Sequence, residues 1–142
     1  MAVGTDAIIM DALLGHLSSL TFSPALAISY PGVEFPASGQ AKPANYLQAT
    51  FLPNVTTNSE LGAGQEQHRG LLQVSVYWKN GAGLVKPLEA ADRIIDHFAK
   101  GTTLHAGGLK IVIDRKPYAS APLQDGDRLQ TPVTIQYHCF AE

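Results

Sequence analysis

Apolar and polar residues alternate most regularly between Leu72 and Lys79. The apolar positions of this stretch are Leu72, Val74, Val76 and Trp78. A period of two is typical of a β-strand with one buried face, because successive side chains of a strand point to opposite sides of the sheet. No other stretch alternates as clearly, so we expect this strand to lie in the centre of a sheet.

Weaker alternation predicts further strands on both sides of this one. Between residues 21 and 54 a continuous helix is excluded, because prolines recur there and each removes a backbone donor. The extended segments that remain are residues 25–30, 45–52, 109–116 and 131–140. Residues 54–67 are polar and contain glycine, so we expect a long loop there.

Two stretches have the periodicity of an amphipathic helix. The first runs from Thr5 to Leu20, with Thr5 expected as the N-cap and Asp6 in the first turn. In the second, the residues expected on the buried face are Leu84, Leu88, Ala91, Ile95 and Phe98. Gly101 stands where this second helix should end.

Strands and helices in this order predict an α+β fold. No repeated strand–helix–strand units are evident, so we expect a mostly antiparallel sheet of about five strands packed with two helices. The 142 residues are enough for one hydrophobic core. Residues 1–142 are therefore predicted to form a single domain.

The composition indicates a folded protein and argues against several functions. Hydrophobic residues make up 45% of the chain, charged residues 15%, and the net charge is -2, so a nucleic-acid-coating protein is not expected. The single cysteine, Cys139, excludes an internal disulfide and a thiolate zinc cluster, and we expect it to be a buried strand residue. Residues 1–20 lack the basic start of an export signal, and no apolar stretch reaches the roughly 20 residues of a membrane span. No membrane role is expected.

The segment from Asn80 to Lys86 joins a strand to a helix and contains glycines, as nucleotide phosphate sites do. A dinucleotide fingerprint would need a third glycine after Gly81 and Gly83, at the position of Lys86. A P-loop would need Ser or Thr after Lys86, where Pro87 stands. Because Asn-Gly is a common turn dipeptide, we interpret the segment as a turn.

Other patterns do not predict a catalytic, cofactor-binding or metal-binding site either. The histidines are His16, His68, His97, His105 and His138. Their spacing matches no metal-binding motif. Asp92 and Asp96 share a helical face, but a solvated face explains both carboxylates. Asp125 and Asp127 flank a glycine and are interpreted as part of a turn. We therefore expect no enzyme activity and no cofactor.

Several segments, taken in order, resemble the phage tail terminator-like family of tailed phages and prophages. They are YLQATFLPN from residue 46, HRGLLQVSVYWKNGAG from residue 68 and TPVTIQYHCF from residue 131. The positions that carry the resemblance are Leu61, Gly62, His68, Arg69, Gly70 and Gln73. The most distinctive of them are Arg69, Gly70 and Gln73.

The resemblance implies a structural protein of the virion rather than an enzyme. Family members are expected to form a ring, a hexamer, on the head-proximal end of the tail tube, to end its growth and to join it to the head connector. The implied partners are further copies of the chain, the tail tube protein and the head connector protein, with no specific nucleic-acid binding. Assembly would take place in the host cytoplasm, and the six motif positions would serve it.

Two other interpretations stay open at this point. The chain could be a different head–tail connector or minor tail protein. A function of another class, a small-molecule binding module or an enzyme, would use the polar segment 54–68 with His68 and Arg69.

Overall fold

A computed structural model of the protein describes residues 4–22, 25–36, 39, 41–53, 57–58, 66–81 and 83–141. Within these residues the chain forms two helices and nine strands. The elements are α1 (Thr5–Ser18), β1 (Ala27–Ser29), β2 (Tyr46–Pro53), β3 (Thr57–Asn58), β4 (Glu66–Lys79), α2 (Val85–His97), β5 (Thr103–Ala106), β6 (Leu109–Ile113), β7 (Tyr118–Ala119), β8 (Leu123–Asp125) and β9 (Arg128–Ala141).

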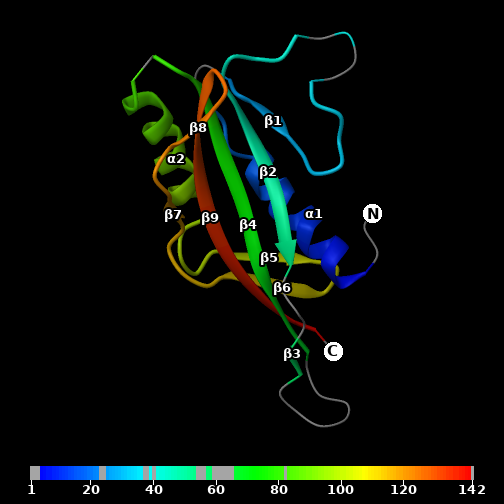
Figure 1. The fold of residues 1–142 in the computed structure, drawn as a ribbon. Coiled ribbons are helices and arrows are strands. Elements are labelled where there is room, and N and C mark those ends of the chain that lie inside the picture. Colours follow the sequence, from blue (N-terminus) through cyan, green and yellow to red (C-terminus); the bar gives the residue numbers. More distant parts are fainter. Residues whose placement is uncertain are drawn as a thin grey trace.

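All nine strands belong to one curled sheet, seen in Figure 1. Its main path runs β1-β2-β4-β9-β6-β5, while β3 pairs with β4 and both β7 and β8 pair with β9. The predicted α+β class is confirmed. The expectation of about five mostly antiparallel strands is wrong in two respects, because the sheet is larger and β1 runs parallel to β2. The strands that the sequence did not predict have only two to four residues, too few for a period of two to show.

The two longest strands, β4 and β9, form the middle of the sheet. Each has 14 residues, and they pair over their whole length, from Glu66 opposite Ala141 to Lys79 opposite Arg128. Since β4 lies between β2 and β9, the predicted central position of this strand is confirmed. On its other side, β9 pairs in turn with β6, β7 and β8.

The predicted loop at residues 54–67 is only partly correct. Residues 57–58 form β3, which pairs with β4, and β4 already begins at Glu66. Two-residue β3 and the polar start of β4 lack the apolar alternation that marks a strand in sequence. Residues 54–56 and 59–65 lie outside the described part of the chain.

Both helices pack on the same face of the sheet and form the core with it. Figure 1 looks onto the opposite face, with α1 behind β2 and α2 beside β9. From α1 the buried residues are Ile9, Leu13 and Leu17, as the apolar stripe predicts. From β4 they are Leu72, Val74 and Val76, and from β9 Val133, Ile135, Tyr137 and Cys139. The prediction of a buried strand position for Cys139 is confirmed.

Two details of the predicted helices are wrong. The N-cap of α1 is Gly4, and Thr5 is the first helical residue and caps nothing with its side chain. In α2 the exposed fractions of Leu84 and Leu88 are 43% and 40%, so neither belongs to the core. The residues that α2 does bury are Pro87, Ala90, Ala91, Ile94 and Ile95. Because each helical residue advances by about 100°, Leu88 lies at the edge of this buried stripe and not in its middle.

Candidate functional site

Four of the sequence-predicted positions lie on β4, and the alternation of the strand divides them between the two faces of the sheet. His68 and Gly70 are in phase with buried Leu72 and so face the helices, while Arg69 and Gln73 face the opposite side. The face of β2, β4 and β9 away from the helices is called the open face below. Leu61 and Gly62 lie outside the described residues. The structure therefore does not bring the predicted positions together into one site.

Gly70 stands where the sheet leaves no room for a side chain. A Cβ atom there would lie 2.6 Å from the carbonyl oxygen of Leu52 and 2.7 Å from the hydroxyl oxygen of Tyr137. Tyr137 is opposite Gly70 in the register, and its ring stacks on Phe51 with 5.8 Å between ring centroids. The aromatic ring thus covers the bare backbone of the glycine, as happens in other sheets with an interior glycine. These close contacts explain why the fold needs a glycine at position 70, and the sequence alone did not reveal this requirement.

His68 connects the sheet to the start of α1. Its side chain is buried, and its Nδ1 atom lies 3.6 Å from the Oδ1 atom of Asp6 in the first helical turn. Burial raises the pKa of the Tyr137 hydroxyl above its ordinary value, and the negative charge of Asp6 raises it further. These polar groups belong to the packing between α1 and the sheet.

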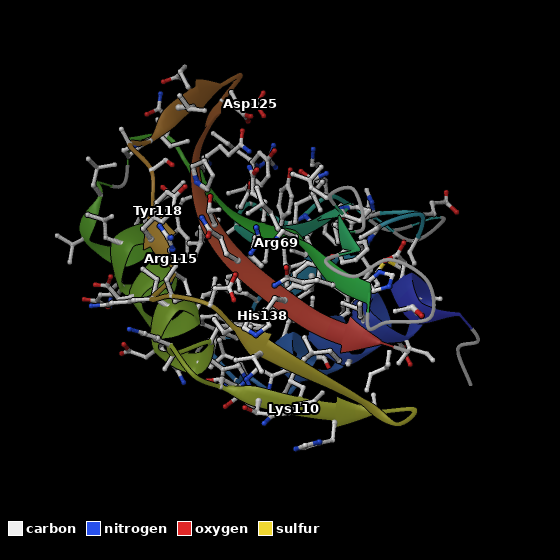
Figure 2. All side chains as sticks on the ribbon, turned by 90° about the horizontal axis from the view of Figure 1, so that it is seen from below. Arg69, Lys110, Arg115, Tyr118, Asp125 and His138 are labelled. Carbon is white, nitrogen blue, oxygen red and sulfur yellow. The ribbon has the colours of Figure 1, made fainter. Side chains whose placement is uncertain are left out.

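Arg69 lines a hollow of about 390 Å³ at the lower end of the open face. Its walls come from the end of β2, the middle of β4, β9 and the segment that follows β6. The lining residues that matter for its chemistry are Leu52, Arg69, Leu71, Asp114, Arg115 and Gln136. Figure 2 shows Arg69, Arg115 and His138 in this region of the molecule, with Asp125 at the far end of the sheet.

Positively charged side chains outnumber negatively charged ones in the lining of the hollow. The one acidic group among its described lining residues, Asp114, accepts a hydrogen bond from Nδ1 of His138, the register partner of Arg69. Among the described residues, no carboxylate lies within ion-pair distance of Arg69 or Arg115. The hollow therefore carries two guanidinium groups, neither in an ion pair within the described part of the chain, and a single carboxylate, so that positive charge is in excess.

The upper end of the open face is closed by hydrogen bonds. Arg128 donates to the carbonyl oxygens of Pro43 and Ala44 at 2.9 and 3.1 Å, and its guanidinium lies over the Tyr46 ring. Farther along the face, the Tyr77 hydroxyl donates to the amide oxygen of Gln48 at 3.0 Å. The proline-rich segment is thereby held against the sheet, which leaves the lower end as the accessible part of the open face.

The segment from Asn80 to Lys86 is a turn, as the sequence predicted. The Asn80 N–H donates to the carbonyl oxygen of Asp127 at 2.9 Å, and Gly81 has a φ of 93°, a conformation that glycine adopts without strain. Lys86 is exposed and lies 3.8 Å from Glu89. Within the described ranges, no group of three or more His, Cys, Asp or Glu side chains has the arrangement of a metal site. The described helices include none long and apolar enough to cross a membrane.

A second accessible surface lies at the start of α2. Leu84, Val85 and Leu88 have exposed fractions of 43%, 70% and 40%. Large apolar side chains that stand exposed next to one another often belong to an interface with another protein. This surface is called the α2 apolar patch below, and two of its residues, Leu84 and Leu88, are ones that the helical periodicity wrongly placed in the core.

Sequence reasoning missed the hollow because its parts are far apart in the chain. Arg69 and Arg115 come together only through the pairing of β4 with β9 and of β9 with β6. Arg115 stands near the end of the strand predicted at residues 109–116, and that position was the one available signal. Without the register, nothing connected it to Arg69.

Comparison with known proteins identifies one family. A family model described as "Phage tail terminator protein" matches residues 8–137 of the chain. No curated protein sequence matches it. A solved chain that is 21% identical superimposes with a TM-score of 0.79, and 96% of each chain is covered. At 21% identity this likeness shows that the two chains share a fold and nothing further.

Proposed function

Because the chain belongs to the phage tail terminator protein family, we propose that it caps the phage tail tube, ends the polymerisation of the tube and joins it to the head connector. Membership of this family makes it a structural protein of the phage tail, located in the virion tail. The family is one of structural proteins and not of enzymes. The specific roles in the first sentence are the proposal.

The observation that carries the proposal is the extent of the family match. It runs from α1 into β9 and so includes both helices and the sheet that packs against them. A match of this extent covers the arrangement of the whole subunit and not an isolated motif. It supports a role that depends on the shape of the subunit and on its association with others.

The subunit is proposed to assemble into a closed hexameric ring through contacts between unlike surfaces. A head-to-tail contact closes into a ring only when the rotation between neighbours divides a full turn, and otherwise it forms a filament. The subunit offers unlike surfaces for such contacts, the α2 apolar patch and the lower end of the open face. We propose the α2 apolar patch for the contact between subunits, because apolar area gives most of the free energy of stable oligomer interfaces.

The motif positions receive different proposed roles. Arg69 and Gln73, on the open face, would contact other tail proteins, while His68 and Gly70 would keep that face in shape from the helix side. Leu61 and Gly62 are proposed to serve assembly as well. The tail tube protein and the head connector protein are the proposed partners, at the head-proximal end of the tail.

Electron microscopy tests the location and symmetry. Purified protein is added to the cognate tube protein during assembly, and class averages of tube ends are compared with and without it. The proposal expects a ring with six-fold symmetry at one end of each tube. A Leu88→Gln variant with an unchanged melting temperature should form fewer rings. Bare ends at saturating protein would refute the capping role.

A different connector or minor tail protein remains the second candidate, and the same images decide between them. Protein bound along the tube, or at both ends, would favour a minor tail protein. The small-molecule alternative based on segment 54–68 is less favoured, because His68 and Arg69 point to opposite faces of the sheet and cannot line one site together.

A further inference from the structure

The hollow at the lower end of the open face has the size and chemistry of a peptide site. Its volume of about 390 Å³ lies within the range of roughly 300–1,000 Å³ typical of ligand pockets, well above what a single ion would fill. It is open to solvent next to exposed Arg69, and its walls come from four separate stretches of chain.

Polar and apolar groups are both present in this hollow. Arg69 and Arg115 provide guanidinium groups, and these bind carboxylates with paired, charge-assisted hydrogen bonds. Leu52, with 43% of its surface exposed, and Leu71 provide apolar wall. A suitable ligand would therefore combine a carboxylate with an adjacent apolar side chain.

The hydrogen bond between Asp114 and His138 keeps the Asp114 carboxylate from pairing with the arginines of the hollow. Since Asp114 accepts from His138 Nδ1, this carboxylate is already engaged, and neither Arg69 nor Arg115 has it as an ion-pair partner. An incoming carboxylate would thus meet two guanidinium groups that form no ion pair with any described residue, against the single negative charge of Asp114.

We propose that this hollow binds an extended acidic segment of a partner protein, in which acidic and apolar side chains alternate. This inference deepens the proposed function. It rests on the proposed function only in taking the partner to be another tail protein. The apolar wall formed by Leu52 and Leu71 disfavours a nucleic-acid phosphate, which has no apolar group to place there. Two exposed acidic residues of the chain itself already stand beside a cation, Asp127 beside Arg128 and Glu89 beside Lys86, which makes both of them poor ligands for the hollow of a second copy.

The proposal is tested with the full-length protein and a short capped peptide of alternating leucine and glutamate. Amide chemical shifts are followed by NMR as peptide is added up to about 5 mM, so that binding as weak as a Kd of about 1 mM is detected. We expect saturable shifts centred on Arg69, Leu71 and Gln136, and weaker binding at higher salt. The same peptide with glutamine in place of glutamate should bind at least about tenfold more weakly.

Matched variants locate the binding. Arg69→Gln and Arg115→Gln should each weaken the acidic peptide by roughly tenfold, since each removes one paired contact to a carboxylate. Arg93→Gln, which removes the same charge from the outer side of α2, should leave the affinity unchanged. Melting curves of all variants check that the fold is retained.

Several results would overturn the proposal. These are no saturable shifts at the highest peptide concentration, equal binding of the glutamate and glutamine peptides, or equal loss in Arg93→Gln. If inorganic phosphate displaces the peptide and binds as tightly as the peptide does, the hollow would be assigned to a phosphate ligand. A change in the sedimentation of the free protein caused by Arg69→Gln would assign it to a second copy. Since the peptide experiment needs no tail tube, its failure leaves the capping role standing, and a failure to cap leaves the peptide result valid.

Discussion

At the scale of single residues, Gly70 shows how one position can fix the geometry of the sheet. Any Cβ atom there would meet backbone atoms of β2 and the hydroxyl of Tyr137 at less than 3 Å. Gly70→Ala is expected to lower the free energy of unfolding by about 1–3 kcal/mol, the usual cost of an overpacked core. Urea unfolding at a fixed pH measures it.

Gly15 provides a control of opposite sign for this substitution. It is exposed in the last turn of α1, and a Cβ atom there would have no atom within 4 Å. Gly15→Ala should therefore raise the free energy of unfolding by up to about 1 kcal/mol, because alanine is the better helix former. If both substitutions had the same sign and size, the close approach at Gly70 would not govern its identity.

His16 and His97 join the ends of the two helices. Nε2 of His16 donates to the carbonyl oxygen of His97, and Nε2 of His97 donates to the carbonyl oxygen of His16, both at 2.7 Å. The rings stack with centroids 4.0 Å apart. Each histidine thus donates to a carbonyl group in the last turn of the other helix, and the His16 carbonyl also accepts from Ser19.

This pair makes the stability of the protein depend on pH. Burial, only partly opposed by the hydrogen bond to the His16 carbonyl, lowers the pKa of His97 below its ordinary value of 6.5. The unfolded chain then binds a proton more readily, so the free energy of unfolding should fall as the pH drops through about 6.5, and continue to fall until the lower folded-state pKa is passed.

His97→Gln keeps a donor for the carbonyl group but cannot titrate. The decrease in the free energy of unfolding between about pH 7.5 and pH 5 should be smaller in this variant than in the unchanged protein. His105→Gln, at an exposed position of β5, should retain the full decrease. Identical pH profiles for all three proteins would show that the burial of His97 has no such effect.

At the scale of elements, the burial of β4 and the orientation of α2 can each be tested by separate substitutions. Val76 is fully buried in β4, so Val76→Asp would place a carboxylate in the core at a cost of several kcal/mol, against a total stability of about 5–15 kcal/mol. We expect this variant to be unfolded by circular dichroism. Thr50→Asp, exposed on β2, should fold, and a folded Val76→Asp protein would contradict the central place of the strand.

The corrected orientation of α2 has its own test. Leu88→Gln changes an exposed side chain and should shift the free energy of unfolding by less than about 0.5 kcal/mol. Ile94→Gln changes a fully buried side chain of the same helix and should cost at least about 2 kcal/mol. Thermal unfolding of both proteins decides the point, since the orientation predicted from sequence would give Leu88→Gln the larger cost.

At the scale of the whole molecule, the sequence predicted what depends on long repeating patterns. Residues 72–79 of β4 alternate clearly enough to show both the strand and its central position, although the polar start of the same strand does not alternate. The four residues of β5 and the two of β7 do not, and their pairing depends on β6 and β9 being in place. Periodicity also assigned Leu88 to the core, because an exposed leucine looks the same in sequence as a core leucine.

The candidate site was predictable only in part, for the same reason. Arg69 was selected as a motif position, but its surroundings are created by the register between strands that are distant in sequence. His68 and Gly70 were selected with it, although they support the opposite face. A pattern of adjacent letters cannot separate positions that bind a partner from positions that shape the sheet behind them.

The length distribution of tail tubes tests the central claim most directly. Tubes are assembled from the cognate tube protein with increasing amounts of the chain, and their lengths are measured by electron microscopy. If the protein ends polymerisation, the mean length should fall as its concentration rises, and Leu88→Gln should require more protein for the same effect. Tubes that grow equally long with and without the protein would contradict its role as a terminator.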